Sequence, residues 1–223
     1  MNNYNNEGYS IVEALISIFM IDKGEIKLLL FKKKDEPYKG YWMLPGSELK
    51  NTESLEENIN NYILKYCGFS DIYIEQSSVF SEVDRLPNNR VIAISYLGLI
   101  DSISVDLKQE TFETIESEWF NIELIPKVIY DHDIIIENNI KQLREKIINS
   151  NILKILFPSD FTLPELQKVY EQILGKKLDR RNFRKKFITF GLIEDTGYKN
   201  EGYTGRPAKL YRFKENLDEI NLF

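Results

Sequence analysis

The sequence predicts a mixed α/β domain followed by a smaller module of two short helices and a β-hairpin. Apolar, β-prone runs alternate with polar connections over the first two thirds of the chain, where helical spacing is confined to two segments. After residue 148 the pattern changes to two capped helical segments and two short strands. The charge changes there too, because residues 1–150 hold 15 Lys and Arg against 25 Asp and Glu, whereas residues 151–223 hold 14 against 10. We therefore divide the chain into domains at residues 1–148 and 149–223.

An acidic body joined to a basic module favours a polyanion as the partner of that module. The chain has 223 residues, of which 43% are apolar, enough to form a core. It contains no run of about 18 apolar residues, and its first residues lack the basic and apolar regions of a signal peptide. The one cysteine, Cys67, has no partner for an internal disulfide, and the one histidine, His132, lacks companions for a transition-metal site. We expect a cytoplasmic protein without a membrane span.

Two apolar runs near the start of the chain predict a β-hairpin. Ile11 to Ile21 and Ile26 to Phe31 are rich in β-branched and aromatic residues, and Asp22 to Glu25 between them contain a turn signal. The lysine-rich polar loop from Lys32 to Gly40 then leads to Trp42.

A strand, loop and helix over residues 44–69 organise the rest of this domain. A Pro-Gly pair breaks the apolar run, and Ser54 with Glu57 three residues later has the spacing of a capping box. Apolar residues then recur every four positions, and Gly68 stands where the end of a helix needs a residue with positive φ.

The same stretch resembles the Nudix box, G-x5-E-x7-R-E-U-x-E-E-x-G-U with U apolar, across residues 46–69. When the final Gly-U pair is aligned, the first glutamate of the box falls on Glu53. The three helical glutamates fall on Tyr62, Lys65 and Tyr66. The resemblance is therefore to the frame of the motif, and the box is degenerate.

In active members of the Nudix family those helical glutamates hold Mg²⁺ or Mn²⁺ against a pyrophosphate. Tyrosine and lysine do not replace them, so we expect neither a metal site nor catalysis. The resemblance implies a Nudix-like α/β/α sandwich with a mixed sheet for residues 1–148. The remaining patterns fit that fold, with strands in 71–80, 90–100 and 116–121 and a closing helix in 131–148.

An acid beside an arginine on the loop between two strands suggests a ligand site. Asp84 and Arg85 suit hydrogen bonding to sugar hydroxyls or phosphate. A surface ion pair of little consequence is an equally open interpretation. We expect a small-molecule effector to bind near Trp42, Asp84, Arg85 and Arg90.

Two capped helical segments begin the C-terminal module. Thr162 and Glu165 have capping-box spacing, and apolar residues follow at i, i+3, i+4 and i+7. Asp179 is a candidate N-cap of the second helix, in which Phe183 and Phe187 fall four apart and are predicted to face inward.

Leu192 to Glu194 and Ala208 to Phe213 read as strands flanking a glycine-rich loop, Gly197 to Pro207. Two helices, a turn with glycine and a hairpin predict a winged helix-turn-helix domain in residues 149–223. A docking module with a solvated basic face is the alternative, but five of the seven residues from Arg180 to Lys186 are basic, which favours DNA. We expect base contacts from Arg180, Arg181, Asn182 and Arg184, and phosphate contacts from Lys176, Lys177, Lys185, Lys186 and Arg206.

The degenerate box, the segment FTLPELQKVYEQILGKKLDRRNFRKKF and the wing GRPAKLYRF together resemble the Nudix-related transcriptional regulators of the NrtR type. Within that family they are most similar to the sugar-responsive branch in Bacteroidetes, the AraR-type arabinose regulators. The resemblance implies a homodimer on a double-stranded DNA operator and an effector such as L-arabinose, with ADP-ribose the less favoured candidate. Effector binding would then change the spacing between the two reading helices.

Two other functions remain open at this point. One is a metal-dependent Nudix hydrolase of nucleoside-diphosphate compounds, whose metal would be held by displaced acids, among them Glu53 and Glu57. The other is a sensor that binds ADP-ribose without hydrolysing it and regulates NAD metabolism. The sequence does not name the effector, the operator or the sign of regulation.

Overall fold

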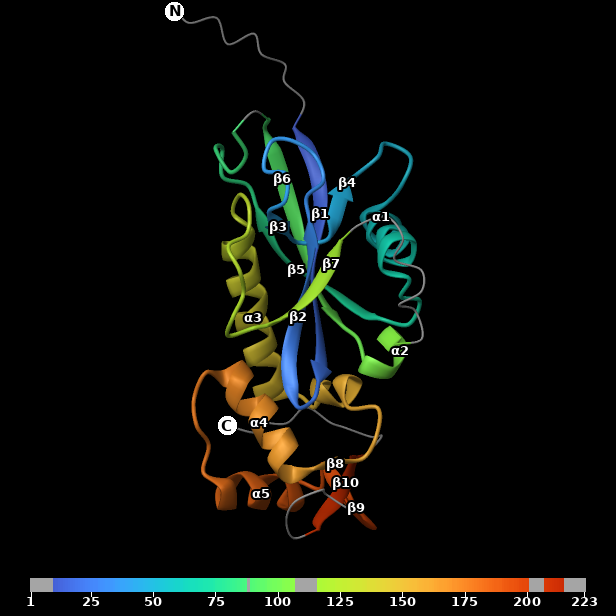
Figure 1. Ribbon diagram of the computed structural model, residues 1–223, viewed down its shortest axis with the longest axis vertical. Coiled ribbons are helices and arrows are strands. Elements are labelled where there is room, and N and C mark those ends of the chain that lie inside the picture. Colours follow the sequence, from blue (N-terminus) through green and yellow to red (C-terminus); the bar gives the residue numbers. More distant parts are fainter. Residues whose placement is uncertain (1–9, 88, 107–115, 201–206, 215–223) are drawn as a thin grey trace, which may run out of the picture.

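A computed structural model of the chain describes residues 10–87, 89–106, 116–200 and 207–214. A seven-stranded mixed sheet forms the upper body in Figure 1, with helices on both faces, and a small helical module with a three-stranded sheet lies below it. The strands of the large sheet are β1 Ile11–Asp22, β2 Glu25–Lys32, β3 Trp42–Met43, β4 Gly46–Glu48, β5 Tyr73–Phe80, β6 Val91–Leu99 and β7 Ser117–Asn121.

The long strand β1 is the centre of the large sheet. It pairs in parallel with β6 along most of its length, while its first half pairs with β4 and its second half with β2, both antiparallel. β5 extends the sheet beyond β6, and β3 and β7 pair with β2. The predicted β1–β2 hairpin is confirmed, with Lys23 and Gly24 as its two-residue turn.

The loop and helix of the box also form as predicted. Helix α1, Leu55–Tyr62, begins with the capping box of Ser54 and Glu57, and a π-helical turn, Ile63–Cys67, leads to Gly68 at φ 71°. Gly46 on β4 lies so close to β1 that a Cβ atom there would come within 2.1 Å of a backbone oxygen. Only glycine permits this pairing.

Helices cover both faces of the large sheet. α1 and the short helix α2, Ser102–Asp106, lie on one side, and the 18-residue helix α3, His132–Asn149, lies on the other (Figure 1). A 3₁₀ turn, Ile152–Leu156, then leads into the second module. The predicted α/β/α sandwich is confirmed. The sequence did not predict α2 or the 3₁₀ turn, because five-residue segments carry too little periodicity.

The second module contains β8 Phe161–Thr162, α4 Leu163–Leu174, α5 Arg180–Thr189, β9 Ile193–Asn200 and β10 Ala208–Phe213. Both predicted N-caps are confirmed: Thr162 forms a capping box with Glu165, and the side chain of Asp179 accepts from the backbone N–H of Asn182 at 2.8 Å. One prediction was wrong, because β9 continues through Gly197 to Asn200 where a loop was expected. Pairing with β10 outweighs the turn propensity of the glycine there.

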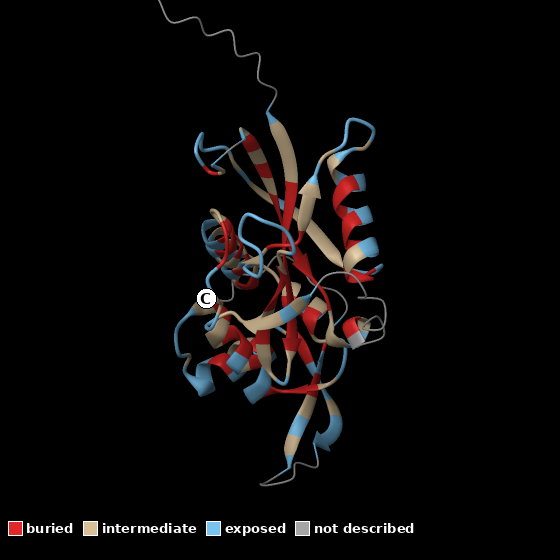
Figure 2. Cartoon of the chain, turned by 45° about the horizontal axis from the view of Figure 1, so that its top comes forward, coloured by how far each residue is buried: buried red, intermediate tan, exposed pale blue. Residues whose placement is uncertain are grey.

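Buried residues gather along β1, β6 and the inner faces of the helices, whereas α5 and the β9–β10 hairpin are largely exposed (Figure 2). In the part of the chain that the structure describes, no helix has the length and apolar character needed to cross a membrane.

Candidate nucleic-acid interface and ligand pocket

Helix α5 presents a basic outer face on a buried aromatic base. Phe183 and Phe187 are buried and lie 5.5 and 5.3 Å from the ring of Tyr170 on α4, measured between centroids. Their four-residue spacing fixes which side of the helix is inward. Four basic side chains therefore point outward, and all are exposed: Arg180, Arg181, Arg184 and Lys185.

A groove of about 510 Å³ separates α5 from the wing, and we call it the α5 groove. Arg180 and Arg184 line it from the helix, and Lys199 on β9 and Lys209 on β10 line it from the hairpin. Lys209 also forms an ion pair with Asp195 at 2.5 Å. Sequence reasoning missed the two lysines, although Lys199 lies within the predicted wing loop and Lys209 lies just after it. A basic groove of this kind matches the backbone of a nucleic acid.

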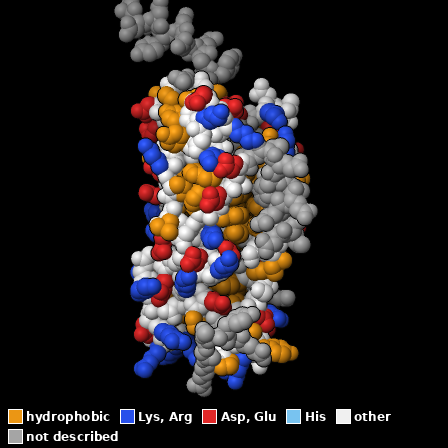
Figure 3. All heavy atoms as spheres, viewed as in Figure 1, with side chains coloured by type: hydrophobic (Ala, Val, Ile, Leu, Met, Phe, Trp, Pro, Cys, Tyr) orange, Lys and Arg blue, Asp and Glu red, His pale blue; other side chains and the backbone are white. Residues whose placement is uncertain are grey.

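The other predicted DNA-binding residues do not share this groove. Asn182, Lys185 and Lys186 border a second cavity on the opposite side of α5, beside Phe190. Lys176 and Lys177 are exposed on the α4–α5 turn, where the ammonium of Lys177 lies 3.0 Å from Glu171. Arg206 lies outside the described residues. Figure 3 shows Lys and Arg side chains gathered at the lower end of the molecule, where α5 lies.

A further cavity, of about 660 Å³, lies at the opposite end of the molecule from α5, and we call it the tyrosine pocket. Its volume is within the range typical of small-molecule sites. Tyr38 and Tyr130 meet edge to face in it, with ring centroids 5.3 Å apart. Five charged residues also line its wall: Glu82, Asp84, Arg85, Asp131 and Asp133.

Arg85 is a buried charged side chain of the tyrosine pocket: only 1% of it is exposed, and its guanidinium pairs with the carboxylates of Glu13 and Asp131. Its Nε and Nη2 donate to the two carboxylate oxygens of Asp131 at 2.9 and 2.8 Å, and its Nη1 donates to Glu13 at 2.7 Å. Burial works to lower the pKa of Arg85, but these hydrogen bonds raise it above its usual value. Burial raises the pKa of Glu13 against the pull of Arg85.

The four predicted effector residues are divided by the structure. Asp84 and Arg85 line the tyrosine pocket. Arg90 donates from Nη1 to the backbone oxygens of Ser81 and Glu82, so it holds the loop that forms the wall. Trp42 packs against Phe120 instead, at a centroid distance of 4.9 Å, and lies beneath the Lys32 ammonium. Sequence reasoning missed Tyr38 and Tyr130, since no local pattern shows that residues so distant in the chain meet.

The degenerate box positions do not offer a metal site. Tyr62 is buried and hydrogen-bonds to the backbone of Gly46, and its ring packs on Tyr66 at 4.7 Å. The ammonium of Lys65 lies 4.9 Å from the centre of the Tyr66 ring. A divalent cation needs oxygen ligands with negative charge, which this set does not supply. No group of three or more possible metal ligands from His, Cys, Asp and Glu occurs among the described residues.

The acids near the start of α1 are held by local hydrogen bonds. Glu53 accepts from the backbone N–H of Lys50 and from the side chain of Asn58, at 3.1 and 2.9 Å, and the Asn58 hydrogen bond lowers the pKa of Glu53. Glu57 completes the capping box by accepting from the N–H of Ser54 at 2.8 Å. These contacts support a structural role for both carboxylates.

His132 is also structural, and it holds the strand that leads into the box. Its Nδ1 accepts from the backbone N–H of Leu44 at 2.9 Å, so the imidazole must be unprotonated at that nitrogen. Burial lowers the pKa of His132 to about 4.

Comparison with known proteins defines the class first. The fold is similar to that of Shewanella oneidensis NrtR in complex with a 27mer DNA, with a TM-score of 0.76 and 28% identity over 91% of this chain and 93% of that one. Residues 155–213 match the family model described as the NrtR DNA-binding winged helix domain. The chain is thus a Nudix-like α/β domain followed by a winged helix, the class of a DNA-binding transcriptional regulator.

The family follows from a relative of known name. The chain is 31% identical, over 89% of its length and 80% of the relative's, to the ADPR responsive transcriptional repressor NtrR of Acinetobacter baylyi. It belongs to the NrtR family of transcriptional regulators. Half of the chain is also 33% identical to an ADP-ribose pyrophosphatase of Methanocaldococcus jannaschii, over 64% of that protein. None of the relatives named here is a sugar-responsive regulator, so they lend no support to the arabinose branch.

Proposed function

We propose that ADP-ribose, and not a free pentose, is the effector of this regulator, and that the Nudix-like domain binds it without hydrolysis. The observation that carries this is the similarity along nearly the whole chain to a repressor whose name states that it responds to ADP-ribose. The expectation that the sugar branch comes first is thereby replaced by the alternative that the sequence left open.

The tyrosine pocket and the loop beside it offer side chains that suit the adenine, the ribose hydroxyls and the diphosphate of such a ligand. Tyr38 and Tyr130 provide ring faces and edges on which an adenine can stack. Carboxylates such as Asp84 and Asp133 accept hydrogen bonds from ribose hydroxyls. The loop that carries Tyr38 also carries several lysines, which suit the diphosphate: Lys33, Lys34 and Lys39.

The proposal that hydrolysis is absent rests on the box positions. Tyrosine and lysine stand where the family's metal-binding glutamates are expected, and Tyr62 is packed into the core. The residues therefore do not fit the divalent cation on which Nudix hydrolysis depends. Incubation with ADP-ribose and Mg²⁺ should leave the compound intact by chromatography, and turnover above a protein-free control would contradict this.

On DNA, α5 would read base edges while the α5 groove and the wing hold phosphates. A single winged helix presents one reading helix, so we expect a homodimer to occupy two half-sites about one helical turn of DNA apart, or a multiple of it. Ultracentrifugation of the protein–operator complex should give two chains per operator.

The decisive experiment is fluorescence anisotropy on DNA from upstream of the protein's own gene cluster, at several salt concentrations. Each titration is repeated with ADP-ribose, L-arabinose, other pentoses or no addition. We expect tight binding that weakens steeply with salt and that ADP-ribose changes by about tenfold or more. A change produced by a pentose alone would return the sugar branch to first place, and binding without sequence preference would reject an operator in that DNA.

A further inference from the structure

At the tyrosine pocket, one side chain ties two long elements together. Arg85 hydrogen-bonds to Glu13, near the start of β1, and to Asp131, the N-cap of α3. The β1–β2 hairpin and α3 both run from this pocket toward the winged helix (Figure 1). The 18 residues of α3 span about 27 Å at 1.5 Å per residue. Two parallel elements are thus joined at their upper ends by a residue of the pocket wall.

At the other end, both elements attach to α4. From the hairpin side, the backbone N–H of Ile26 donates to the side-chain oxygen of Gln172 at 3.2 Å, and Glu25 pairs with Lys168 at 2.9 Å. From α3, the Nε of Arg144 donates to the backbone oxygen of Ile173, close to the C-terminal end of α4. An arginine at this end also interacts favourably with the helix dipole. The DNA-binding domain is therefore held from two sides.

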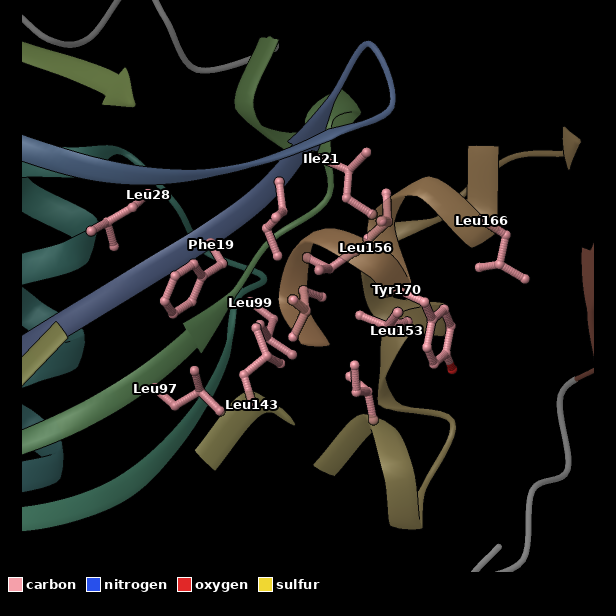
Figure 4. Close-up of a cluster of buried hydrophobic side chains, with 14 of the residues drawn as sticks. Phe19, Ile21, Leu28, Leu97, Leu99, Leu143, Leu153, Leu156, Leu166 and Tyr170 are labelled. Atoms are coloured by element: carbon pink, nitrogen blue, oxygen red, sulfur yellow. The ribbon is translucent and has the colours of Figure 1, made fainter. Parts of the chain in front are cut away.

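A continuous apolar core lies between these attachments. Leu28 and Leu97 of the large sheet, Leu143 of α3 and Leu166 and Tyr170 of α4 belong to one cluster, which Figure 4 shows crossing from the sheet to the winged helix. Large apolar contacts of this kind oppose free motion between domains. A signal from the pocket must therefore travel as a small shift of packed elements, not as a swing about a flexible linker.

We infer that the β1–β2 hairpin and α3 carry the effector signal to the winged helix. They are linked to each other by Arg85 at the tyrosine pocket, and both are attached to α4 at the winged helix. A ligand that shifts the hairpin relative to α3 would tilt α4, and α5 would tilt with it. Arg144 and Gln172 are then positioning residues for regulation, because Arg144 attaches α3 to α4 and Gln172 attaches the hairpin to α4. This inference rests on the proposed function, since it assumes an effector in the tyrosine pocket.

Substitutions at the lower attachments test the linkage without touching the pocket or α5. Arg144→Met and Gln172→Leu each remove one hydrogen bond while keeping similar side-chain bulk. Arg144→Lys keeps a hydrogen-bond donor at its position, and Gln172→Glu keeps an acceptor. These two serve as rescue variants. Lys141→Met, an exposed position one turn earlier on α3, is the matched control.

For each full-length variant, calorimetry gives the affinity for ADP-ribose, and anisotropy gives the operator affinity with and without it. We expect both separate affinities to stay within about twofold of wild type, while the effect of ADP-ribose on operator binding falls from about tenfold to below about twofold. The rescue and control variants should keep the wild-type effect.

An unchanged effect in both Arg144→Met and Gln172→Leu would overturn the linkage. Loss of operator binding already without ADP-ribose would overturn it too, because the contacts would then merely hold the domain in place. Failure of the proposed function looks different, since wild-type protein itself would then bind no ADP-ribose. In that case the linkage is tested with whichever member of the pentose panel changes wild-type operator binding, and a panel without any such member rejects it.

Discussion

Helices α1 and α5 are both short and both begin with a side-chain N-cap, but they leave different groups outside. Along α1 and the π-helical turn that follows it, Tyr62, Lys65 and Tyr66 occupy the positions where the Nudix box has helical glutamates. The carboxylates of Glu53, just before α1, and Glu57 accept local hydrogen bonds. Along α5 only the phenylalanines are buried, and the arginines face outward. The comparison teaches that the residues of the degenerate box pack and cap the fold, whereas the exposed positive charge needed for a polyanionic partner lies on α5.

The largest effect that would break this comparison is expected at Tyr62. Tyr62→Glu places a carboxylate among buried apolar side chains and leaves a cavity, so we expect the free energy of unfolding to fall by about 4 kcal/mol. Urea denaturation followed by circular dichroism measures it. Lys65→Glu, exposed on the next turn, should change it by less than about 0.5 kcal/mol. A Tyr62→Glu protein as stable as wild type would show that the box interior still tolerates an acid.

On α5, the double variant Arg180→Ala/Arg184→Ala removes both arginines of the α5 groove. We expect operator binding to weaken by about 3 kcal/mol, or about a hundredfold, because contacts from arginine to base edges contribute about 1–3 kcal/mol each. Anisotropy at fixed salt measures this, with the melting temperature as a check of folding. Lys127→Ala, exposed on the Nudix-like domain, is the control and should leave binding unchanged. An equal loss in both proteins would contradict the assignment of the interface to α5.

Acid should weaken the hold of His132 on the strand that enters the box. Because the pKa of His132 is lowered to about 4 in the folded protein, the unfolded chain binds this proton more readily between about pH 6.5 and 4. Stability should therefore fall as the pH is lowered through that window, by about 2 kcal/mol at pH 5. His132→Asn keeps an acceptor for Leu44 but does not titrate, so its unfolding free energy should depend less on pH over the same range. Identical pH profiles would show that the imidazole is not responsible.

The smallest effect separates the two caps. Ser54→Ala and Asp179→Ala should each lower stability by about 1 kcal/mol, because each cap satisfies a backbone N–H at the start of its helix. Operator binding should change only in Asp179→Ala, since only α5 is expected to meet DNA. Urea denaturation and anisotropy on the same samples give both quantities. A change in operator affinity with Ser54→Ala would mean that α1 takes part in DNA binding.

Much of the fold could be predicted from local pattern. The hairpin turn at Lys23 and Gly24, the capping boxes at Ser54 and Thr162 and the positive φ of Gly68 each depend on a few neighbouring residues, and all are present. The extension of β9 to Asn200 was missed because it depends on pairing with β10. Short elements without periodicity, such as α2, were missed for a related reason.

The site residues show the same division between what local pattern predicts and what tertiary packing decides. The inward and outward faces of α5 follow from helical spacing, so its exposed arginines could be named in advance. Lys199 and Lys209 could not, because strands bring them to the groove from a hairpin later in the chain. Trp42 was expected near the effector, but the structure packs it on Phe120 instead.

By itself, the sequence determined the order of the longer elements, the degenerate box and the basic face of α5, since all of these are properties of short segments. Only the tertiary structure decided that Arg85 is buried between Glu13 and Asp131, and that Tyr38 meets Tyr130. It also decided that α4 is fastened both to the hairpin and to α3. These contacts join residues far apart in the chain, and close packing of the whole core, not local propensity, sets which of them meet.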